Sequence, residues 1–201
     1  MKRTFFVTMI TLALLTGCAS NTTTSNETTT DTSETTEAVT EETPTQEETP
    51  AQEEPTENLV AIGDTITTDY AEIKINNACI TYEVLPDDTS SYYNYYAAET
   101  GNVYVELDVD VKNLQKQTMQ CDDVLVATAD YNDGFTYNSF AVVEDPTLGF
   151  TYSNISAIQP LATQGMRYLF NCPEEIDQTD YPLFIEIQPA GTTDIYKLII
   201  R

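Results

Sequence analysis

The feature that most constrains the fold is a strict two-residue alternation in residues 103–112. The apolar members of this segment are Val103, Val105, Leu107, Val109 and Val111, and polar or aromatic side chains stand between them. Successive side chains of a β-strand point to opposite faces. The pattern therefore predicts a strand with one buried face and one face in water, which is typical of an antiparallel sheet.

The rest of the C-terminal two thirds of the chain also shows patterns that predict β-strands. The alternation recurs at 72–75 and, on the opposite parity, at 78–84, so the change of phase at Asn76-Asn77 predicts a bulge or a bend. An apolar run of strand length follows at 124–129, and further strands are predicted at 166–172, 183–188 and 195–200, with turn signals at 132–134 and 189–191. Apart from a single turn after Pro173, no segment indicates a helix. We expect an all-β fold, a two-sheet antiparallel sandwich over residues 59–201.

The first residues are typical of an export signal. Lys2 and Arg3 precede an apolar run from Phe5 to Leu15. As a helix this run would cover about 16 Å, roughly half of a membrane's hydrocarbon core, so it is too short to span one. It has the length of a signal-peptide core.

Residues 15–18, Leu-Thr-Gly-Cys, resemble the lipobox of bacterial lipoproteins. The resemblance implies that residues 1–17 are removed and that the sulfur of Cys18 is lipidated. Two acyl chains would then anchor the protein stably to the outer face of the cell membrane. The alternative is an ordinary signal peptide with a chance cysteine.

Residues 18–58 have almost nothing to bury. After Cys18 they consist mainly of Thr, Glu, Ser, Pro, Gln and Asn, with Glu-Glu-Thr-Pro at 41–44 and again at 47–50. Such a composition cannot offset the entropy of ordering a chain. It predicts a disordered stalk that carries the folded domain away from the membrane. A threonine glycosylation region is the alternative.

Charge and composition exclude several classes of function. The formal charge of −25 repels nucleic acid and anionic lipid headgroups, so no nucleic-acid partner is expected. The chain has no histidine, which rules out Ser-His-Asp and Cys-His catalysis and the usual zinc sites. No phosphate-binding or dinucleotide motif is present. We expect no catalytic residues, no cofactor and no enzymatic activity, although a carboxylate-pair hydrolase stays formally open.

The segment Asp130-Tyr131-Asn132-Asp133-Gly134 resembles the start of a calcium-binding loop, but its glycine falls one place early and Ala141 stands where a glutamate is needed. Three acidic pairs are the other candidate metal ligands. They are Asp87-Asp88, Asp122-Asp123 and Glu144-Asp145, and each lies at a predicted turn. Calcium prefers such oxygen ligands. The favoured interpretation is that these side chains face water, so no metal site is predicted.

A tyrosine-rich segment is the most unusual part of the domain. Tyr92, Tyr93, Tyr95 and Tyr96 lie between two predicted strands, among Ser, Asn and Gly. Tyrosine gives a binding loop rigid amphipathic contact area at low entropic cost. The four tyrosines are therefore the candidate ligand contacts. The alternative is that their rings fold over a sheet edge and cap the core.

Residues 59–201 also resemble the immunoglobulin-like domain of unknown function of Gram-positive surface lipoproteins, which is similar to the mycobacterial immunoprotective extracellular antigen. The matching pieces are short and stand in the family's order: 62–65, 104–113, 133–137, 158–161 and 168–175. The resemblance implies an immunoglobulin-like sandwich behind a lipid anchor and a disordered stalk. It implies no established activity and no catalytic residues.

Three cysteines remain besides Cys18, so one disulfide can form. Cys172 ends a segment that resembles the sixth strand of the sandwich, and Cys79 lies late in the second. Such strands would finish at the same pole and face each other across the core. We therefore expect a Cys79–Cys172 disulfide, with three buried free thiols as the alternative.

These observations lead to one hypothesis and two alternatives. The hypothesis is a non-catalytic interaction module, anchored by lipid, that binds an unknown extracellular or cell-wall ligand. The first alternative is a calcium-stabilised domain or an accessory component of an envelope or solute-uptake complex. The second is a fold that only shields or spaces.

Overall fold

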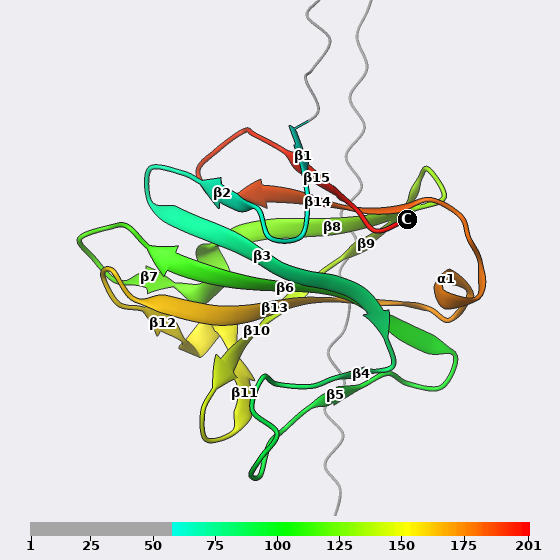
Figure 1. Ribbon diagram of the computed structural model, residues 1–201, viewed down its shortest axis with the longest axis horizontal. Coiled ribbons are helices and arrows are strands. Elements are labelled where there is room, and N and C mark those ends of the chain that lie inside the picture. Colours follow the sequence, from blue (N-terminus) through cyan, green and yellow to red (C-terminus); the bar gives the residue numbers. More distant parts are fainter. Residues whose placement is uncertain (1–57) are drawn as a thin grey trace, which may run out of the picture. The chain divides into compact units, whose positions relative to one another are not determined.

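The computed structural model describes residues 58–201, and strands dominate this part of the chain (Figure 1). A six-stranded sheet forms one layer of the domain. Its strands, in spatial order, are β11 (Gly149–Tyr152), β10 (Phe140–Asp145), β13 (Thr163–Pro173), β6 (Asn102–Asn113), β3 (Ala71–Thr81) and β2 (Thr65–Thr67). Every neighbouring pair in this sheet is antiparallel.

A five-stranded sheet forms the other layer. Its strands are β1 (Asn58–Val60), β15 (Tyr196–Ile199), β14 (Leu183–Pro189), β8 (Leu125–Tyr131) and β9 (Phe135–Asn138). Its pairs are antiparallel except that β1 runs parallel to β15. The remaining elements are short: the strand pairs β4 (Glu83–Val84) with β5 (Tyr96–Ala97) and β7 (Met119–Gln120) with β12 (Ala157–Ile158), the helix α1 (Glu175–Gln178), and 3-10 turns at Cys121–Asp123 and Ser153–Ile155.

The strand order is that of an immunoglobulin-like sandwich. The order β3-β6-β13-β10 matches strands A-B-E-D, and the order β9-β8-β14-β15 matches C′-C-F-G. The predicted fold class is therefore confirmed. The helix α1 follows Pro173 where a single turn is expected.

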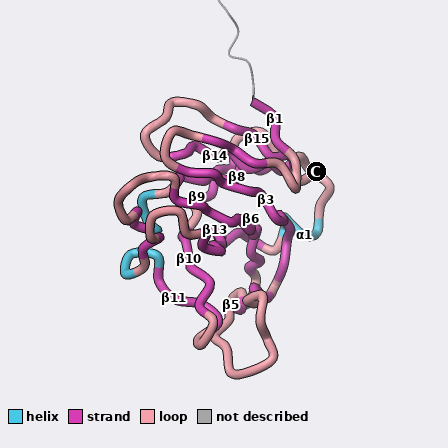
Figure 2. The backbone as a smooth tube through the Cα atoms, turned by 60° about the vertical axis from the view of Figure 1, so that its left-hand side comes forward, coloured by secondary structure: helices cyan, strands magenta, loops and turns pink. Residues whose placement is uncertain are grey.

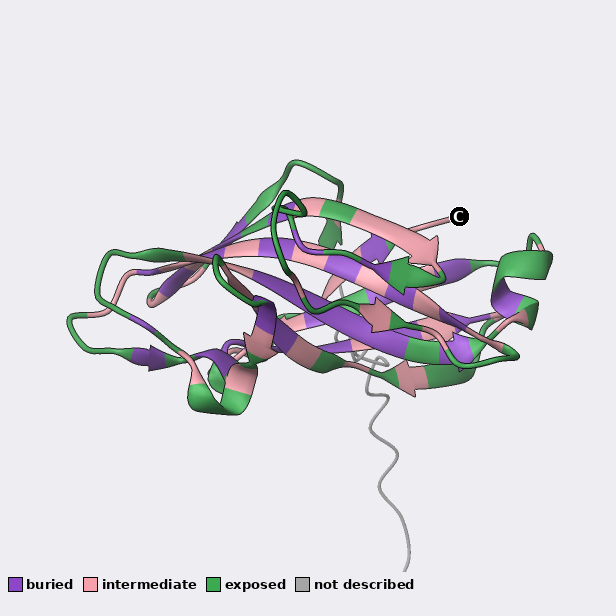
Figure 3. Ribbon diagram, turned by 90° about the horizontal axis from the view of Figure 1, so that it is seen from below, coloured by how far each residue is buried: buried purple, intermediate pink, exposed green. Residues whose placement is uncertain are grey.

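The core lies between the two sheets and is built from the predicted alternation. Along β6, buried residues alternate with partly exposed ones over the whole strand (Figure 3). The inward side chains from Val103 to Val111 are fully buried. They pack against the inward faces of β8 and β14, which carry among others Ala127, Ala129, Leu183, Ile185 and Ile187.

Two local predictions are also confirmed. The register between β3 and β6 shifts between Ile75 and Asn77, which places the bulge at the predicted change of phase. The turn between β8 and β9 contains Asn132 and Asp133 at positive φ, 52° and 54°. Asn and Asp occupy this left-handed region more readily than other non-glycine residues, so the turn follows from its residue types.

The outward face of the six-stranded sheet differs from the expectation of an open, wet surface. The outward side chains of β6 are only partly exposed. A second apolar cluster of Val84, Val142, Phe150 and Leu169 lies on this side, with Tyr96 and Tyr104 packed against it. The segment between β3 and β6, which contains β4 and β5, therefore covers part of the sheet's outer face.

The signal peptide (1–17), the lipidation site Cys18 and the stalk up to residue 57 lie outside the described residues. Within residues 58–201, no helix is both long and apolar enough to cross a bilayer.

Candidate functional site

The loop between β4 and β5, residues 85–95, contains three of the four candidate tyrosines, and Tyr96 begins β5 immediately after it. We call residues 85–95 the tyrosine loop. It lies beside the hairpin of β10 and β11 (Figures 1 and 2). The backbone N–H of Asn94 donates to the carbonyl of Leu148 at 2.6 Å, which ties the end of the loop to the turn of that hairpin.

Gly149 makes this close approach possible. Its φ is +80°, a region that glycine occupies without strain. A Cβ at this position would lie 2.8 Å from both the Asn94 carbonyl oxygen and the Tyr93 Cβ, and 3.0 Å from Pro86 Cγ. The glycine therefore lets both ends of the tyrosine loop rest directly on the β10–β11 turn.

The structure divides the four tyrosines into two groups. Tyr96 turns inward, where its ring lies 5.6 Å from that of Phe140 and 5.8 Å from that of Phe150. Tyr93 is partly buried against the turn, and its ring meets that of Tyr95 edge-on at 6.2 Å. Tyr92 and Tyr95 are 73% and 50% exposed.

The four tyrosines therefore differ in how they pack. Tyr96 caps the second apolar cluster, whereas Tyr92 and Tyr95 are presented to solvent. The hydroxyl of Tyr92 donates to Asn94 Oδ1 at 3.2 Å, within the loop.

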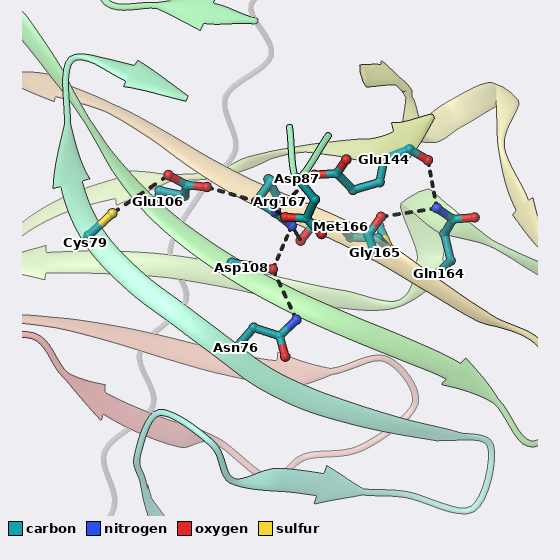
Figure 4. Close-up of polar contacts among 10 residues, drawn as sticks. All are labelled: Asn76, Cys79, Asp87, Glu106, Asp108, Glu144, Gln164, Gly165, Met166 and Arg167. Carbon is teal, nitrogen blue, oxygen red and sulfur yellow. Dashed lines mark hydrogen bonds and ion pairs between the residues drawn. The ribbon is translucent and has the colours of Figure 1, made fainter. Parts of the chain in front are cut away.

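Arg167 fixes the start of the loop. This arginine stands on the outward face of β13, only 3% exposed, and four carboxylates from three other segments surround it (Figure 4). The contacts are Asp87 of the tyrosine loop at 2.5 Å, Asp108 of β6 at 2.6 Å, Glu144 of β10 at 2.9 Å and Glu106 of β6 at 3.0 Å. We call these five residues the arginine cluster.

Register explains how the cluster forms. Arg167 pairs directly with Asp108 across β13 and β6, and with Val142 across β13 and β10. Asp87 and Asp108 accept hydrogen bonds from the guanidinium, whereas Glu106 and Glu144 contact it as ion pairs. Around the rim, Asn76 donates to Asp108 at 3.3 Å, and Gln164 donates to the Glu144 carbonyl at 2.8 Å.

The cluster carries more negative than positive charge. Burial raises the pKa of Glu144 to about 7, against the opposing effect of Arg167 and with a further rise from Asp87. Burial likewise raises the pKa of Glu106 and of Asp108. The single guanidinium is shared among four carboxylates, so it cannot fully compensate the loss of water around each of them.

Sequence reasoning missed Arg167, although a signal was present. The run 166–172 reads as an apolar strand with one charge in it. Arginine is almost never fully buried unless it is paired, so an arginine inside an apolar strand indicates acidic partners nearby. What the sequence lacks is their identity, since Asp108 and Asp87 lie 59 and 80 residues away along the chain.

The three acidic pairs identified in the sequence lie in different parts of the structure. Asp87 and Glu144 meet at Arg167, and Asp88 and Asp145 flank a hollow beside them. Asp122 and Asp123 lie elsewhere, in the turn before β8. Among residues 58–201, no group of three or more His, Cys, Asp or Glu is arranged to hold a metal ion.

The predicted Cys79–Cys172 disulfide is wrong, because the two cysteines lie on opposite faces of the same sheet. Cys79 belongs to β3, which takes the place of strand A, and its Sγ contacts Glu106 at 3.8 Å on the outward face. Cys172 is the last residue but one of β13, which is strand E and not strand F, and it is buried in the core. Cys79, Cys121 and Cys172 are all free thiols.

The fold and the loop on its outer face define an immunoglobulin-like β-sandwich domain. The chain belongs to the family of an uncharacterized β-sandwich protein from Clostridium difficile 630. That protein is 42% identical, with a TM-score of 0.70 over 76% of this chain and 100% of that chain.

More distant comparisons add nothing to this assignment. A conserved hypothetical protein from Bacillus anthracis is 12% identical, with a TM-score of 0.46 over 68% of this chain and 93% of that one, which is too remote for an argument. No family model and no curated protein matches the chain.

Proposed function

We propose that this protein is a lipid-anchored surface lipoprotein whose sandwich is a non-catalytic interaction module, and that the tyrosine loop is its contact surface for an extracellular or cell-wall ligand. The observation that carries the binding proposal is the exposure of Tyr92 and Tyr95 on a loop that is fixed by Arg167 and by Gly149. Exposed aromatic side chains on a preorganised loop lose little entropy on binding.

The anchor proposal rests on the sequence. The short apolar run and Cys18 support lipidation, and the resemblance of residues 59–201 to the domain of Gram-positive surface lipoproteins supports display outside the cell. A cell fractionation with labelled palmitate tests this part. The wild-type chain is expected in the membrane fraction with label, and Cys18→Ser without label. An unlabelled wild-type chain in the cytosol would refute it.

A retention experiment tests the binding part. Fluorescently labelled full-length protein is applied to envelope fragments of the producing cells, and the retained fraction is titrated. The double variant Tyr92→Ser/Tyr95→Ser is expected to lose about tenfold or more in affinity, because it removes both exposed rings.

The matched control removes two exposed aromatic rings elsewhere. Phe135 and Tyr181 are 59% and 49% exposed and belong to a separate aromatic group around Tyr131. Phe135→Ser/Tyr181→Ser is expected to bind like wild type. Equal retention of the loop variant and wild type would contradict the proposal, as would a loss confined to the control.

A further inference from the structure

An acidic hollow lies against the tyrosine loop. Its volume is about 280 Å³, and it opens between the start of the loop and the β10–β11 turn. Four of its seven lining residues are acidic: it is lined by Pro86, Asp87, Asp88, Glu144, Asp145, Pro146 and Gln164. Pockets for whole drug-sized ligands cover roughly 300–1,000 Å³, so this hollow has room for a single long side chain or headgroup.

Hydrogen bonds favour the ionised form of two of these carboxylates. The hydroxyl and backbone N–H of Ser90 donate to Asp88 Oδ1 at 2.6 and 2.8 Å, and Thr147 does the same for Asp145. These hydrogen bonds lower the pKa of both carboxyls. Arg167 contacts Asp87 and Glu144 of the hollow and also contacts Glu106 and Asp108. Because one guanidinium is shared among four carboxylates, the hollow keeps a net negative charge.

Apolar side chains are exposed on the same two loops. Leu85, Tyr92 and Tyr95 belong to the tyrosine loop and Leu148 to the adjoining turn. The surface thus combines an anionic hollow with aromatic and aliphatic groups. Anionic lipid and nucleic acid are repelled by such a surface, and a simple polyamine would leave the apolar groups without partners. A peptide can carry cationic and apolar side chains next to each other.

We infer that the ligand of the tyrosine loop is a cationic peptide segment. A lysine or arginine of that segment enters the acidic hollow, and neighbouring apolar side chains pack on Tyr92 and Tyr95. Tyrosine rings also attract cations directly. The inference rests on the proposed function, in which the tyrosine loop is the contact surface, and it adds the chemistry of the partner.

Fluorescence anisotropy with three synthetic peptides tests the inference. The full-length chain, purified in detergent, is titrated against a labelled peptide of alternating lysine and leucine, against the same peptide with glutamate for lysine, and against one with serine for leucine. The lysine–leucine peptide is expected to bind most tightly, and its affinity is expected to fall with added salt because surface charges are screened.

Charge variants locate the site. Asp88→Asn/Asp145→Asn keeps an oxygen that can accept the loop hydrogen bonds but removes two charges. It is expected to weaken binding about five- to tenfold, the sum of two exposed ion pairs. The control Asp122→Asn/Asp123→Asn makes the same change in net charge away from the loop. It is expected to change the affinity less than about twofold.

The outcomes separate the two proposals. Equal affinity of the lysine and glutamate peptides, or equal losses in the two charge variants, would overturn the cationic-peptide inference. The tyrosine loop would then still be judged by the envelope retention of Tyr92→Ser/Tyr95→Ser. If Tyr92→Ser/Tyr95→Ser is retained on envelope fragments like wild type and also binds the lysine–leucine peptide like wild type, both proposals fail.

Discussion

Arg167 Nη2 lies 2.5 Å from Asp87 Oδ1, and this contact joins the middle of the six-stranded sheet to the tyrosine loop. The two ends of the pair differ sharply, since the side chain of Arg167 is 3% exposed and that of Asp87 is 78% exposed. The arginine is thus a fixed point of the sheet, and the aspartate is the part of the loop that attaches to it.

Replacing Arg167 is expected to cost far more than replacing a surface cation. Arg167→Met leaves part-buried carboxylates without a counter-charge, and the removal of one partner of a buried pair costs about 3–5 kcal/mol of unfolding free energy. Lys112→Met is the control, because Lys112 pairs with Glu72 at 2.8 Å and the two side chains are 40% and 38% exposed. Its cost is expected to stay within about 1 kcal/mol. Urea unfolding measures both, and equal costs would contradict a central role for Arg167.

Gly149 and Gly101 form a matched pair for testing how the tyrosine loop packs on the β10–β11 turn. Both have positive φ, +80° and +86°, but a Cβ meets nothing within 4 Å at Gly101. Gly101→Ala is expected to lose about 1 kcal/mol from backbone strain. Gly149→Ala adds a clash with Tyr93 and Asn94, so it is expected to lose clearly more and to increase hydrogen exchange in residues 85–95. Similar behaviour of the two variants would show that the close contact is unimportant.

Stability is expected to rise as the pH falls from 8 to 5. Glu144 has a pKa of about 7 in the folded state, raised mainly by burial, and an ordinary value in the unfolded chain. The folded state therefore binds the proton more tightly, and it gains stability as the pH falls through about 7. Glu106 and Asp108 shift in the same direction.

The variant Glu144→Gln tests this origin, because glutamine resembles the protonated acid. It is expected to flatten the dependence of unfolding free energy on pH between 5 and 8. At pH 8 the variant is expected to match or exceed wild type. The lowered pKa values of Asp88 and Asp145 act in the opposite sense only below their ordinary range, so they do not disturb this window. A wild type that loses stability steadily from pH 8 to 5 would contradict the assignment.

The three thiols are expected to be free and slow to react. Burial raises the pKa of Cys79 and Cys121 to about 11 and that of Cys172 to about 12, so each is protonated at neutral pH. Thiolates and not thiols are the nucleophiles. A thiol reagent is expected to label these cysteines slowly in the folded protein and fully after unfolding, without prior reduction. A melting temperature that drops on addition of reductant would instead indicate a disulfide.

The fold was largely predictable from the sequence because its pattern is local. The alternation in residues 103–112 determines which face of β6 is buried, and the change of phase at Asn76 locates the bulge. The error over Cys79 and Cys172 came from assigning strands to places in the sandwich. Periodicity predicts that a strand exists, but its neighbours are chosen by contacts between residues far apart in sequence. That is why β13 could be mistaken for strand F.

The candidate site was predictable only in part for the same reason. The composition of the tyrosine segment singled out the loop, yet it could not distinguish the exposed Tyr92 from the partly buried Tyr96. That separation depends on Phe140 and Phe150, which belong to the distant hairpin of β10 and β11. The arginine cluster likewise joins four segments that are separate in the chain.

The most direct test of the account measures how solvent reaches individual tyrosine rings. Nuclear magnetic resonance of the full-length chain with a soluble paramagnetic agent provides this for each ring. We predict strong relaxation enhancement for Tyr92 and Tyr95, weak enhancement for Tyr96 and Tyr168, and backbone order in residues 85–95 close to that of β6. Uniform protection of Tyr92, Tyr95 and Tyr96, or a loop as mobile as a free peptide, would contradict the claim that the sandwich presents a fixed tyrosine surface.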